Sequence, residues 1–418
     1  VKEIIYLYLP QRHRGNRELN YKGCPVNTTP IEANMENFVF YNPVKILFGK
    51  GQIANIATEI PKNAKILMTY GGGSIKKNGV YDQVKSALRE HDVIEFGGIE
   101  PNPTYETLMK AVEIVRNSDI NFLLAVGGGS VADGTKFIAA AANFDGEPWD
   151  ILSKRAPISS ALPIGVVLTL AATGSEMNIN SVVTKAANKE KRHFASPLVY
   201  PRFSVLDPET TFSLPQRQVS NGIVDAFTHT MEQYLTYPVN APLQDRMAEG
   251  ILKTLIEEGP KTLANPQDYD ARANFMWCAT MALNGIIAVG VPQDWATHMI
   301  GHELTALHGL DHGQTLAVVL PSTLTIKREQ KSQKLLQYAE RVWGITTGSE
   351  EERINTAINK TREFFESVGV HTKLSDYNVT LDTIPLVLER LESYGYTALG
   401  EHQDVNLQTV EQILQLCA

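Results

Sequence analysis

The sequence predicts an α/β domain over residues 35–212, followed by an all-α domain over residues 213–418. In the first part, short apolar runs alternate with amphipathic stretches, a pattern typical of a mostly parallel sheet covered on both faces. Two glycine-rich turns directly follow apolar runs in that part. Beyond about residue 212, long helical periodicities dominate and strand patterns disappear. A chain of 418 residues is long enough for two or three domains.

Composition excludes several other classes of protein. Hydrophobic residues make up 43% of the chain and charged residues 20%, which is ordinary for a globular protein. The net charge of -8 argues against nucleic acid or an anionic membrane as a partner, because either needs a basic face. No apolar run approaches the ~18 residues of a membrane-spanning helix. The three cysteines are far apart and form no disulfide framework, which predicts a cytoplasmic protein.

Residues 1–34 have no periodic pattern and contain several prolines and glycines. A short apolar run near the start is followed by Pro10 and a basic cluster instead of a small-residue cleavage site, so it does not match a secretory signal. We expect this segment to be a disordered leader ahead of Met35, where the regular pattern begins.

Strands and helices are expected in alternation within the first domain. The expected strands are 65–70, 93–96, 121–126 and 163–168, and the expected helices are a stretch ending near 89, 104–116 and 131–142. Ligands of parallel α/β sheets bind at the carboxyl ends of the strands. The glycine turns at 71–74 and 127–130 therefore lie where a ligand is expected.

In the second domain, Ser213 and Gln216 have capping-box spacing with Pro215 between them, which predicts a helix start. Apolar residues then recur every four positions from Val219 to Met231. Pro292 is expected to begin a later helix, Gly309 to end it, and Asp311 to cap the next. Further helices are expected near 243–258, 270–288, 292–308, 312–328, 350–368 and 407–416.

The second glycine turn, Gly127-x-Gly129-x-x-Ala132, matches the permissive dinucleotide-binding fingerprint. Its glycines let the backbone approach a ligand closely and direct amide N–H groups toward an anion. A tight strand-to-helix turn without a ligand is the alternative.

The first turn, 71–74, has no carboxylate of the kind that binds the ribose 2′-hydroxyl of NAD. Lys76 and Lys77 follow it closely, so the corner offers room and positive charge for a 2′-phosphate. A solvated loop with two surface lysines is the alternative.

Four histidines, His298, His302, His308 and His312, fall within fifteen residues. His298 and His302 are four apart, which places both on one face of a helix, and Asp225 and His229 have the same spacing. One carboxylate and several imidazoles suit a divalent transition metal, although packed or surface pairs have the same spacing.

The zincin motif H-E-x-x-H is excluded because Ala306 stands where its second histidine should be. His308 is expected to interact with the free carbonyls at the end of its helix.

Taken together, these segments make residues 35–418 resemble the iron-containing (group III) alcohol dehydrogenases, most of all the NADPH-dependent aldehyde reductase or butanol dehydrogenase branch. The resemblance lies in Pro43-x-x-Ile46-x-Phe48-Gly49-x-Gly51, Gly97-Gly98-Ile99-Glu100-Pro101-Asn102-Pro103, Gly127-Gly128-Gly129-Ser130-Val131-Ala132-Asp133, Thr173-Gly174-Ser175-Glu176, Asp225-Ala226-Phe227-Thr228-His229, and His298-x-x-Gly301-His302 through Asp311-His312-Gly313. It implies a Rossmann-like first domain and a dehydroquinate synthase-like overall architecture.

The resemblance also implies functional roles. It assigns one divalent metal, Fe(II) or Zn(II), to Asp225, His229, His298 and His312. It assigns the cofactor to Gly72, Gly73, Ser74, Gly128, Gly129, Ser130, Asp133, Thr169, Thr173 and Lys191. The segment Leu170-Ala171-Ala172 departs from the Thr, Ala and Gly of many members, which bears on the nicotinamide pocket and on Thr169.

The implied activity is hydride transfer between NADP(H) and a small aldehyde or primary alcohol. The metal would act as a Lewis acid on the carbonyl oxygen, and His302 would take part in proton transfer or only line the pocket. A homodimer is implied, and none of the three thiols is expected to carry chemistry. The alternative is a metal-dependent glycerol dehydrogenase or a dehydroquinate synthase-like enzyme of the same fold.

Overall fold

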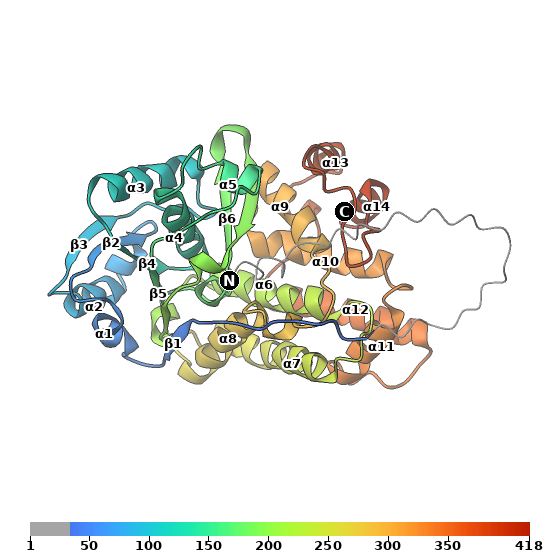
Figure 1. The fold of residues 1–418 in the computed structure, drawn as a ribbon. Helices are drawn as coiled ribbons and strands as arrows, with labels where there is room; N and C mark the ends of the chain where they lie inside the picture. Colours follow the sequence, from blue (N-terminus) through green and yellow to red (C-terminus); the bar gives the residue numbers. More distant parts are fainter. Residues whose placement is uncertain (1–33) are drawn as a thin grey trace.

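The computed structural model describes residues 34–418, which form an α/β part followed by a helical part (Figure 1). The fold class expected from the sequence is therefore confirmed. Residues 1–33, which make up nearly all of the expected leader, lie outside the described residues.

A six-stranded parallel sheet organises the α/β part, in the order β1-β8-β5-β4-β2-β3. Every residue of the central strands β4 and β5 is buried, which explains why both are continuous apolar runs in the sequence. The strands are β1 (Lys45–Phe48), β2 (Lys65–Tyr70), β3 (Asp92–Phe96), β4 (Phe122–Gly127), β5 (Ile164–Leu168) and β8 (Phe203–Leu206).

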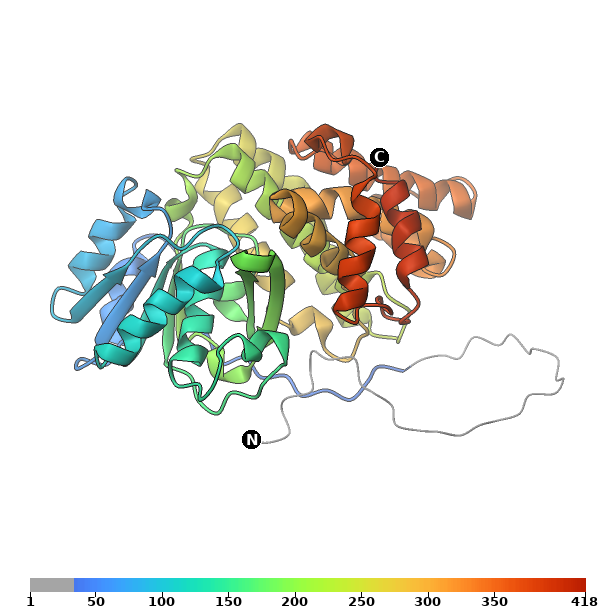
Figure 2. The same ribbon diagram turned by 90° about the horizontal axis from the view of Figure 1, so that it is seen from above.

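Helices cover both faces of this sheet (Figure 2). One face packs on α1 (Ile56–Glu59) and α2 (Val80–Ala87), and the other on α3 (Tyr105–Asn117) and α4 (Gly129–Ala142). Alternate residues of a strand point to opposite faces, so the central strands β2, β4 and β5 contribute to both cores. A short helix, α5 (Asp150–Ser153), joins the second core.

An antiparallel hairpin, β6 (Asn180–Lys185) and β7 (Glu190–Ala195), was not predicted from the sequence. Its strands mix charged and apolar residues and contain no strong apolar run, so their pattern resembles that of a loop. The buried side chains of Val183 and Phe194 join the core that α4 covers. The hairpin thereby brings Lys191 opposite Thr184 at the border with the helical part.

The second part is helical throughout, and among residues 34–418 no helix is both long and apolar enough to cross a membrane. Its helices α11 and α13 were not predicted. The helices are α6 (Gln216–Tyr234), α7 (Pro242–Ala264), α8 (Tyr269–Ala282), α9 (Ala296–His308), α10 (His312–Ile326), α11 (Ser332–Arg341), α12 (Glu350–Ser367), α13 (Thr383–Ser393) and α14 (Leu407–Gln415).

Two of the predicted helix starts are wrong. No side chain caps α6, and Ser213 Oγ instead accepts a hydrogen bond of 3.0 Å from Asn78 Nδ2. Helix α9 begins at Ala296 and not at Pro292, and the Ala296 N–H donates to Asp294 Oδ1. The predicted cap of α10 is confirmed, since Asp311 closes a capping box with Gln314.

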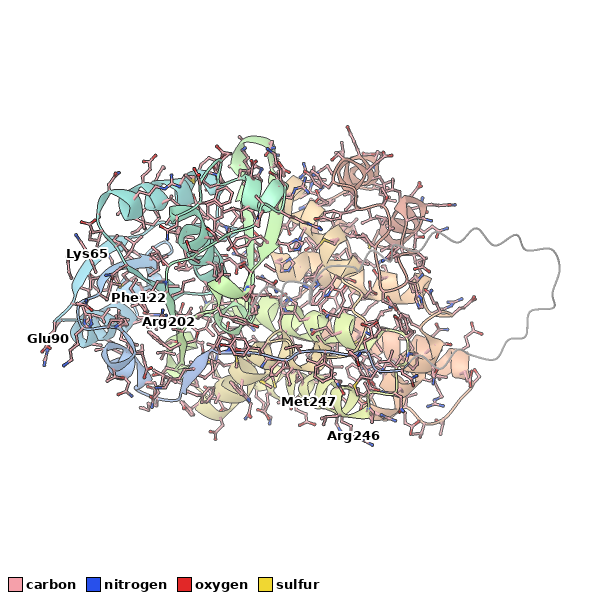
Figure 3. The ribbon with its side chains drawn as sticks, in the orientation of Figure 1. Lys65, Glu90, Phe122, Arg202, Arg246 and Met247 are labelled. Carbon is pink, nitrogen blue, oxygen red and sulfur yellow. The ribbon has the colours of Figure 1, made fainter. Side chains whose placement is uncertain are left out.

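The carboxyl ends of the strands face the helical part. Lys65 and Phe122, which begin β2 and β4, lie on the side of the sheet away from the helical part (Figure 3). On the opposite side, the segment after β5 packs on α8, where Thr280 Oγ1 donates to Glu176 Oε1 at 2.5 Å. The extended chain ahead of β1 runs along the helical part, and Asn42 Nδ2 donates to the Asn284 carbonyl. Both glycine turns therefore open toward the helices.

Candidate metal centre and cofactor cleft

Four predicted metal ligands converge from three packed helices. Asp225 and His229 lie one turn apart on α6, His298 lies in the first turn of α9, and His312 begins α10. Asp225 Oδ1 lies 3.5 Å from His229 Nε2, 3.8 Å from His298 Nε2 and 3.7 Å from His312 Nε2. The tightest group among them consists of Asp225, His229 and His298, whose candidate ligand atoms all lie within 4.8 Å of one another.

The polar atoms at this centre fit a bound cation. Asp225 Oδ1 and His298 Nε2 are both buried, and neither has a hydrogen-bond partner. Buried polar atoms are nearly always paired, so two such atoms that face each other indicate a missing partner. One carboxylate oxygen and three imidazole nitrogens form a donor set that suits Fe(II) or Zn(II).

Electrostatics keep most of these groups ready to bind a metal. Burial lowers the pKa of His229 to about 4 and the pKa of His312 well below its ordinary value. Burial also acts to raise the pKa of Asp225, but His229 and His298 hold that pKa below its ordinary value. The structure therefore presents an ionised carboxylate and neutral imidazoles, with His298 as the exception described next.

Glu232 supports His298 and was missed in the sequence. It lies on α6, two turns after Asp225, and its Oε2 pairs with His298 Nδ1 while its Oε1 accepts from the Thr297 N–H at 2.7 Å. Burial disfavours the charged form of His298, yet the carboxylates of Glu232 and Asp225 raise its pKa to about 9. A carboxylate on the far nitrogen of a histidine ligand fixes its tautomer and ring orientation. The sequence signal that could have revealed Glu232 is its spacing, which places it on the same face of the helix as Asp225 and His229.

His302 and His308 have different surroundings. The His302 ring centroid lies 5.1 Å from that of His312 and 6.3 Å from that of His298, so His302 adjoins the metal centre. Burial lowers the pKa of His302 well below its ordinary value. The expectation for His308 is wrong, because its Nε2 pairs with Thr383 Oγ1 at 2.7 Å and not with the end of its helix.

The second glycine turn packs closely against the segment that follows β5. A Cβ atom added to Gly128 would lie 2.9 Å from Leu170 Cβ, and one added to Gly129 would lie 2.4 Å from Thr173 Oγ1. The turn thus leaves no room for larger residues, and Gly129 begins α4. Ser130 Oγ accepts from the Asn102 N–H at 3.3 Å, which joins this turn to the loop after β3.

Asp133 belongs to a polar network between α4 and the hairpin. Its Oδ1 accepts from Ser175 Oγ at 2.5 Å, and its Oδ2 accepts from the Val182 N–H at 2.9 Å. Lys136, another residue missed in the sequence, donates to Ser175 Oγ at 2.9 Å and also to Asn178. Burial lowers the pKa of Lys136 to about 8 and raises that of Asp133. Each carboxylate oxygen of Asp133 therefore already accepts one hydrogen bond from the protein.

The remaining predicted cofactor residues follow β5 or lie in the β6–β7 hairpin. Thr169 follows β5, and its N–H donates to the Gly127 carbonyl at 3.0 Å. Thr173 lies against Gly129, as described above. Lys191 Nζ donates to Asn102 Oδ1 at 3.0 Å, and burial lowers its pKa to about 8.

Lys191 also lines a cavity of about 440 Å³ between the hairpin and the last turn of α9. Asn102 and Thr184 line the cavity on the α/β side, and residues 305–309 line it on the helical side. Asn102, whose N–H donates to Ser130 Oγ, connects this cavity to the second glycine turn, and the helical side of the cavity is the C-terminal end of α9.

The corner formed by Gly72, Gly73 and Ser74 is open. A Cβ atom added to Gly72 or Gly73 would contact nothing within 4 Å. Lys76 Nζ lies over the rings of Tyr70 and Tyr81, 4.9 Å from each centroid, and 3.7 Å from Glu95 Oε2. Lys85 also pairs with Glu95, so two lysines share that carboxylate and the corner keeps excess positive charge.

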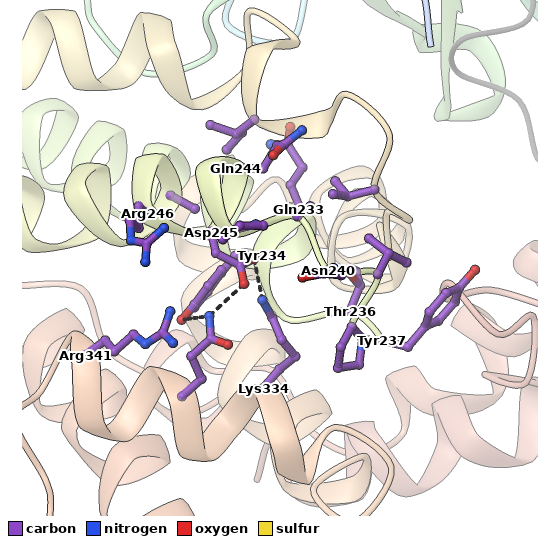
Figure 4. Close-up of a pocket in the computed structure, with 18 residues that line it drawn as sticks. Gln233, Tyr234, Thr236, Tyr237, Asn240, Gln244, Asp245, Arg246, Lys334 and Arg341 are labelled. Atoms are coloured by element: carbon purple, nitrogen blue, oxygen red, sulfur yellow. Dashed lines mark hydrogen bonds and ion pairs between the residues drawn. The ribbon is translucent and has the colours of Figure 1, made fainter. Parts of the chain in front are cut away.

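A second cavity, of about 200 Å³, lies at the other end of α6 (Figure 4). Lys334 pairs there with Asp245 at 2.5 Å, and Arg341 pairs with Glu249 at 3.2 Å. Gln233 also lines the cavity and donates to the carbonyl of His229 at 2.6 Å. Because these charges largely pair with one another, the cavity is a weaker candidate for the functional site than the metal centre.

Comparison with known proteins identifies relatives for both parts. The family model "Iron-containing alcohol dehydrogenase" matches residues 43–208, and "Fe-containing alcohol dehydrogenase family, C-terminal" matches residues 219–417. The chain is 60% identical to the NADPH-dependent aldehyde reductase YqhD of Escherichia coli, over 91% of this chain and 99% of that protein. It is 40% identical to the probable NADH-dependent butanol dehydrogenase 1 of Bacillus subtilis, over 91% of this chain and 99% of that protein.

Solved structures agree with these matches. The crystal structure of Escherichia coli YqhD superimposes with a TM-score of 0.92 at 59% identity, covering 92% of this chain and 100% of that chain. The NADH-dependent butanol dehydrogenase A of Thermotoga maritima superimposes with a TM-score of 0.89 at 37% identity, with the same coverage.

Proposed function

The chain belongs to the iron-containing alcohol dehydrogenase family, and from that premise we propose that it reduces small aldehydes to primary alcohols with NADPH. One divalent metal ion, Fe(II) or Zn(II), would be held by Asp225, His229, His298 and His312. The observation that carries this proposal is the convergence of these four side chains around unpartnered buried atoms, on the side of the molecule toward which the glycine turns open.

NADPH, in preference to NADH, is the second element of the proposal. The matched relatives differ in this respect, since the Escherichia coli protein is named for NADPH and the Bacillus subtilis protein for NADH. The corner at Gly72, Gly73 and Ser74 supports NADPH because it has space for a 2′-phosphate and bears no carboxylate of its own. Lys76, which is held over two tyrosine rings, supplies positive charge beside it.

When bound, the metal would supply Lewis-acid polarisation of the carbonyl, and the nicotinamide would supply the hydride. Gly128, Gly129 and Ser130 would hold the pyrophosphate through close backbone approach, with Asp133, Thr169 and Thr173 along the cofactor toward its nicotinamide. Lys191 would reach a cofactor phosphate across the larger cavity. The helices position the aldehyde and cofactor against each other, which lowers the entropic part of the barrier.

His302 would relay a proton to the product alkoxide. Its pKa lies well below the ordinary value because of burial, so the ring is neutral and carries one N–H. A neutral imidazole can give up that proton while its other nitrogen takes one from water. Its position one turn beyond His298 supports this role.

We propose a homodimer in the cytoplasm. Support for a dimer comes from β1, which is an edge strand, and from a run of exposed apolar residues just before it. This run comprises Met35, Phe38, Val39, Phe40 and Tyr41. The division into domains at residue 212 also remains a proposal, supported by the change from strands to helices between β8 and α6.

Steady-state kinetics with metal analysis test the proposal. The purified protein should contain one Fe or Zn per chain and should consume NADPH with butanal at a kcat/KM at least tenfold higher than with NADH. NAD-dependent oxidation of glycerol, or phosphate release from a dehydroquinate synthase substrate, would instead support the alternative functions. Equal kcat/KM with NADPH and NADH would refute the proposal that the corner at Gly73 accepts the 2′-phosphate of NADPH.

A further inference from the structure

Trp295 has a backbone conformation that bulky residues rarely adopt, and it lies beside the metal-centre histidines. Its φ is 65° and its ψ is 5°, in the left-handed region. For a side chain of this size such a conformation is an outlier, and outliers of this kind persist only where the surroundings hold them. Such outliers are concentrated at functional sites.

The residues on either side of Trp295 are held by independent contacts. The Asp294 N–H donates to the Glu232 carbonyl at 2.9 Å. Asp294 Oδ1 accepts from the Ala296 N–H at 3.0 Å, and Asp294 Oδ2 pairs with Lys331 Nζ at 3.0 Å. The buried Lys331 thus ties the turn to α11, and Glu232 ties it to the metal-binding helix α6. These contacts fix the backbone on both sides of the left-handed residue.

The indole itself is also fixed, and it faces two of the proposed metal ligands. Its Nε1–H donates to Gln293 Oε1 at 2.9 Å, which uses the only hydrogen-bond donor of the ring. Its centroid lies 5.2 Å from that of His298 and 6.2 Å from that of His229, both in edge-to-face arrangements. The half-buried ring therefore presents an apolar surface beside two of the side chains that would hold the metal.

We propose that Trp295 is a specificity-determining residue, whose indole forms the apolar wall against which the alkyl group of the aldehyde lies. The rigid ring limits that group to a short, unbranched chain. This inference rests on the proposed function, because it assumes that an aldehyde binds at the metal centre. The strained turn serves to hold a large flat side chain against the imidazoles.

Substrate discrimination provides the first test. We would compare kcat/KM for butanal and 3-phenylpropanal in the wild type, Trp295→Ala and Trp295→Phe. The ratio of kcat/KM for 3-phenylpropanal to kcat/KM for butanal should rise at least tenfold in Trp295→Ala, since pocket contacts of this kind discriminate about 10- to 200-fold between substrates. Trp295→Phe, which keeps an aromatic ring, should give a smaller increase.

The control is Trp277→Ala, because Trp277 lies on α8 and is partly exposed beside Phe48 at a centroid distance of 5.9 Å. This control should leave the ratio within twofold of the wild type. The inference is overturned if Trp295→Ala also stays within twofold.

A second test does not depend on catalysis. Co²⁺ added to the metal-free protein should quench the fluorescence of a tryptophan beside its site, and the chain has four tryptophans. Trp295→Phe should remove more than half of the quenching, whereas Trp277→Phe should leave it unchanged. Undiminished quenching in Trp295→Phe would show that the ring does not flank the metal.

The two failures are distinguishable. A wild-type protein that reduces no aldehyde would refute the proposed function, and the quenching result would still report the position of the indole. An active wild type with unchanged discrimination in Trp295→Ala would refute only the role of Trp295.

Discussion

Replacing Glu232 by glutamine should weaken metal binding without disturbing any of the four proposed ligands. Glu232 Oε2 pairs with His298 Nδ1, and Oε1 accepts from the Thr297 N–H at 2.7 Å. Glutamine keeps the shape but offers only one acceptor oxygen, so its NH₂ group must face one of these two donors. Loss of such a supporting partner typically lowers metal affinity about 10- to 100-fold, or about 1.4–2.7 kcal/mol.

The assay is competition between the protein and a chelator for Zn²⁺. It should be run above the pKa of His298, which is raised to about 9. Below that pH a proton on His298 competes with Zn²⁺, and Glu232→Gln would weaken this competition and so mask part of the lost metal affinity. Glu249→Gln is the matched control, since Glu249 is a buried carboxylate that accepts from Tyr234 Oη at 2.9 Å, away from the histidines. Wild-type affinity in Glu232→Gln would refute the supporting role of the carboxylate.

Four further outcomes are expected. His298→Ala should reduce bound metal to under a tenth of the wild type and abolish reductase activity, with circular dichroism that still shows a folded protein; full metal retention would contradict the ligand assignment. Zn²⁺ binding at pH 7 should release about one proton, because the raised pKa keeps His298 protonated in the metal-free protein below a pH of about 9. Calorimetry in two buffers measures this proton release, which should vanish as the pH rises above that value. Lys136→Met should lower the free energy of unfolding in urea by about 3–5 kcal/mol, because Lys136 Nζ donates to several buried oxygens. Lys65→Met is the control, because Lys65 forms an exposed ion pair, and it should change the free energy of unfolding by less than about 1 kcal/mol. Gly73→Asp should lower the ratio of kcat/KM for NADPH to that for NADH at least tenfold, since aspartate tolerates the φ of 90° better than most residues; an unchanged ratio would place the 2′-phosphate elsewhere.

Spacing along the chain drew attention to a possible metal group, but the set of four ligands, including His312, came from the resemblance. Asp225 and His229, like His298 and His302, are four apart, and the helix geometry that puts such pairs on one face is a local property. The central strands β4 and β5 were predictable for a similar reason, because full burial on both faces produces continuous apolar runs.

Other features had weak or misleading local signals. The β6–β7 hairpin carries too few apolar residues to be distinguished from a loop, so Lys191 was assigned only through the resemblance. Ser213 has good capping spacing, but its hydroxyl pairs with Asn78, which is distant in sequence. Glu232 continues the helix face of Asp225 and His229, yet nothing near it in sequence shows that His298 is its partner.

The sequence by itself thus determined the class of each part, the helices that carry the proposed ligands, and the glycine turns, because periodicity and backbone freedom are set by neighbouring residues. Only the tertiary structure decided that α6, α9 and α10 bring one carboxylate and three imidazoles together, and that Glu232 supports one of them. It also decided the left-handed conformation of Trp295, which is imposed by contacts with Glu232 and Lys331. Such contacts join residues tens of positions apart, and no local pattern records which of them will meet.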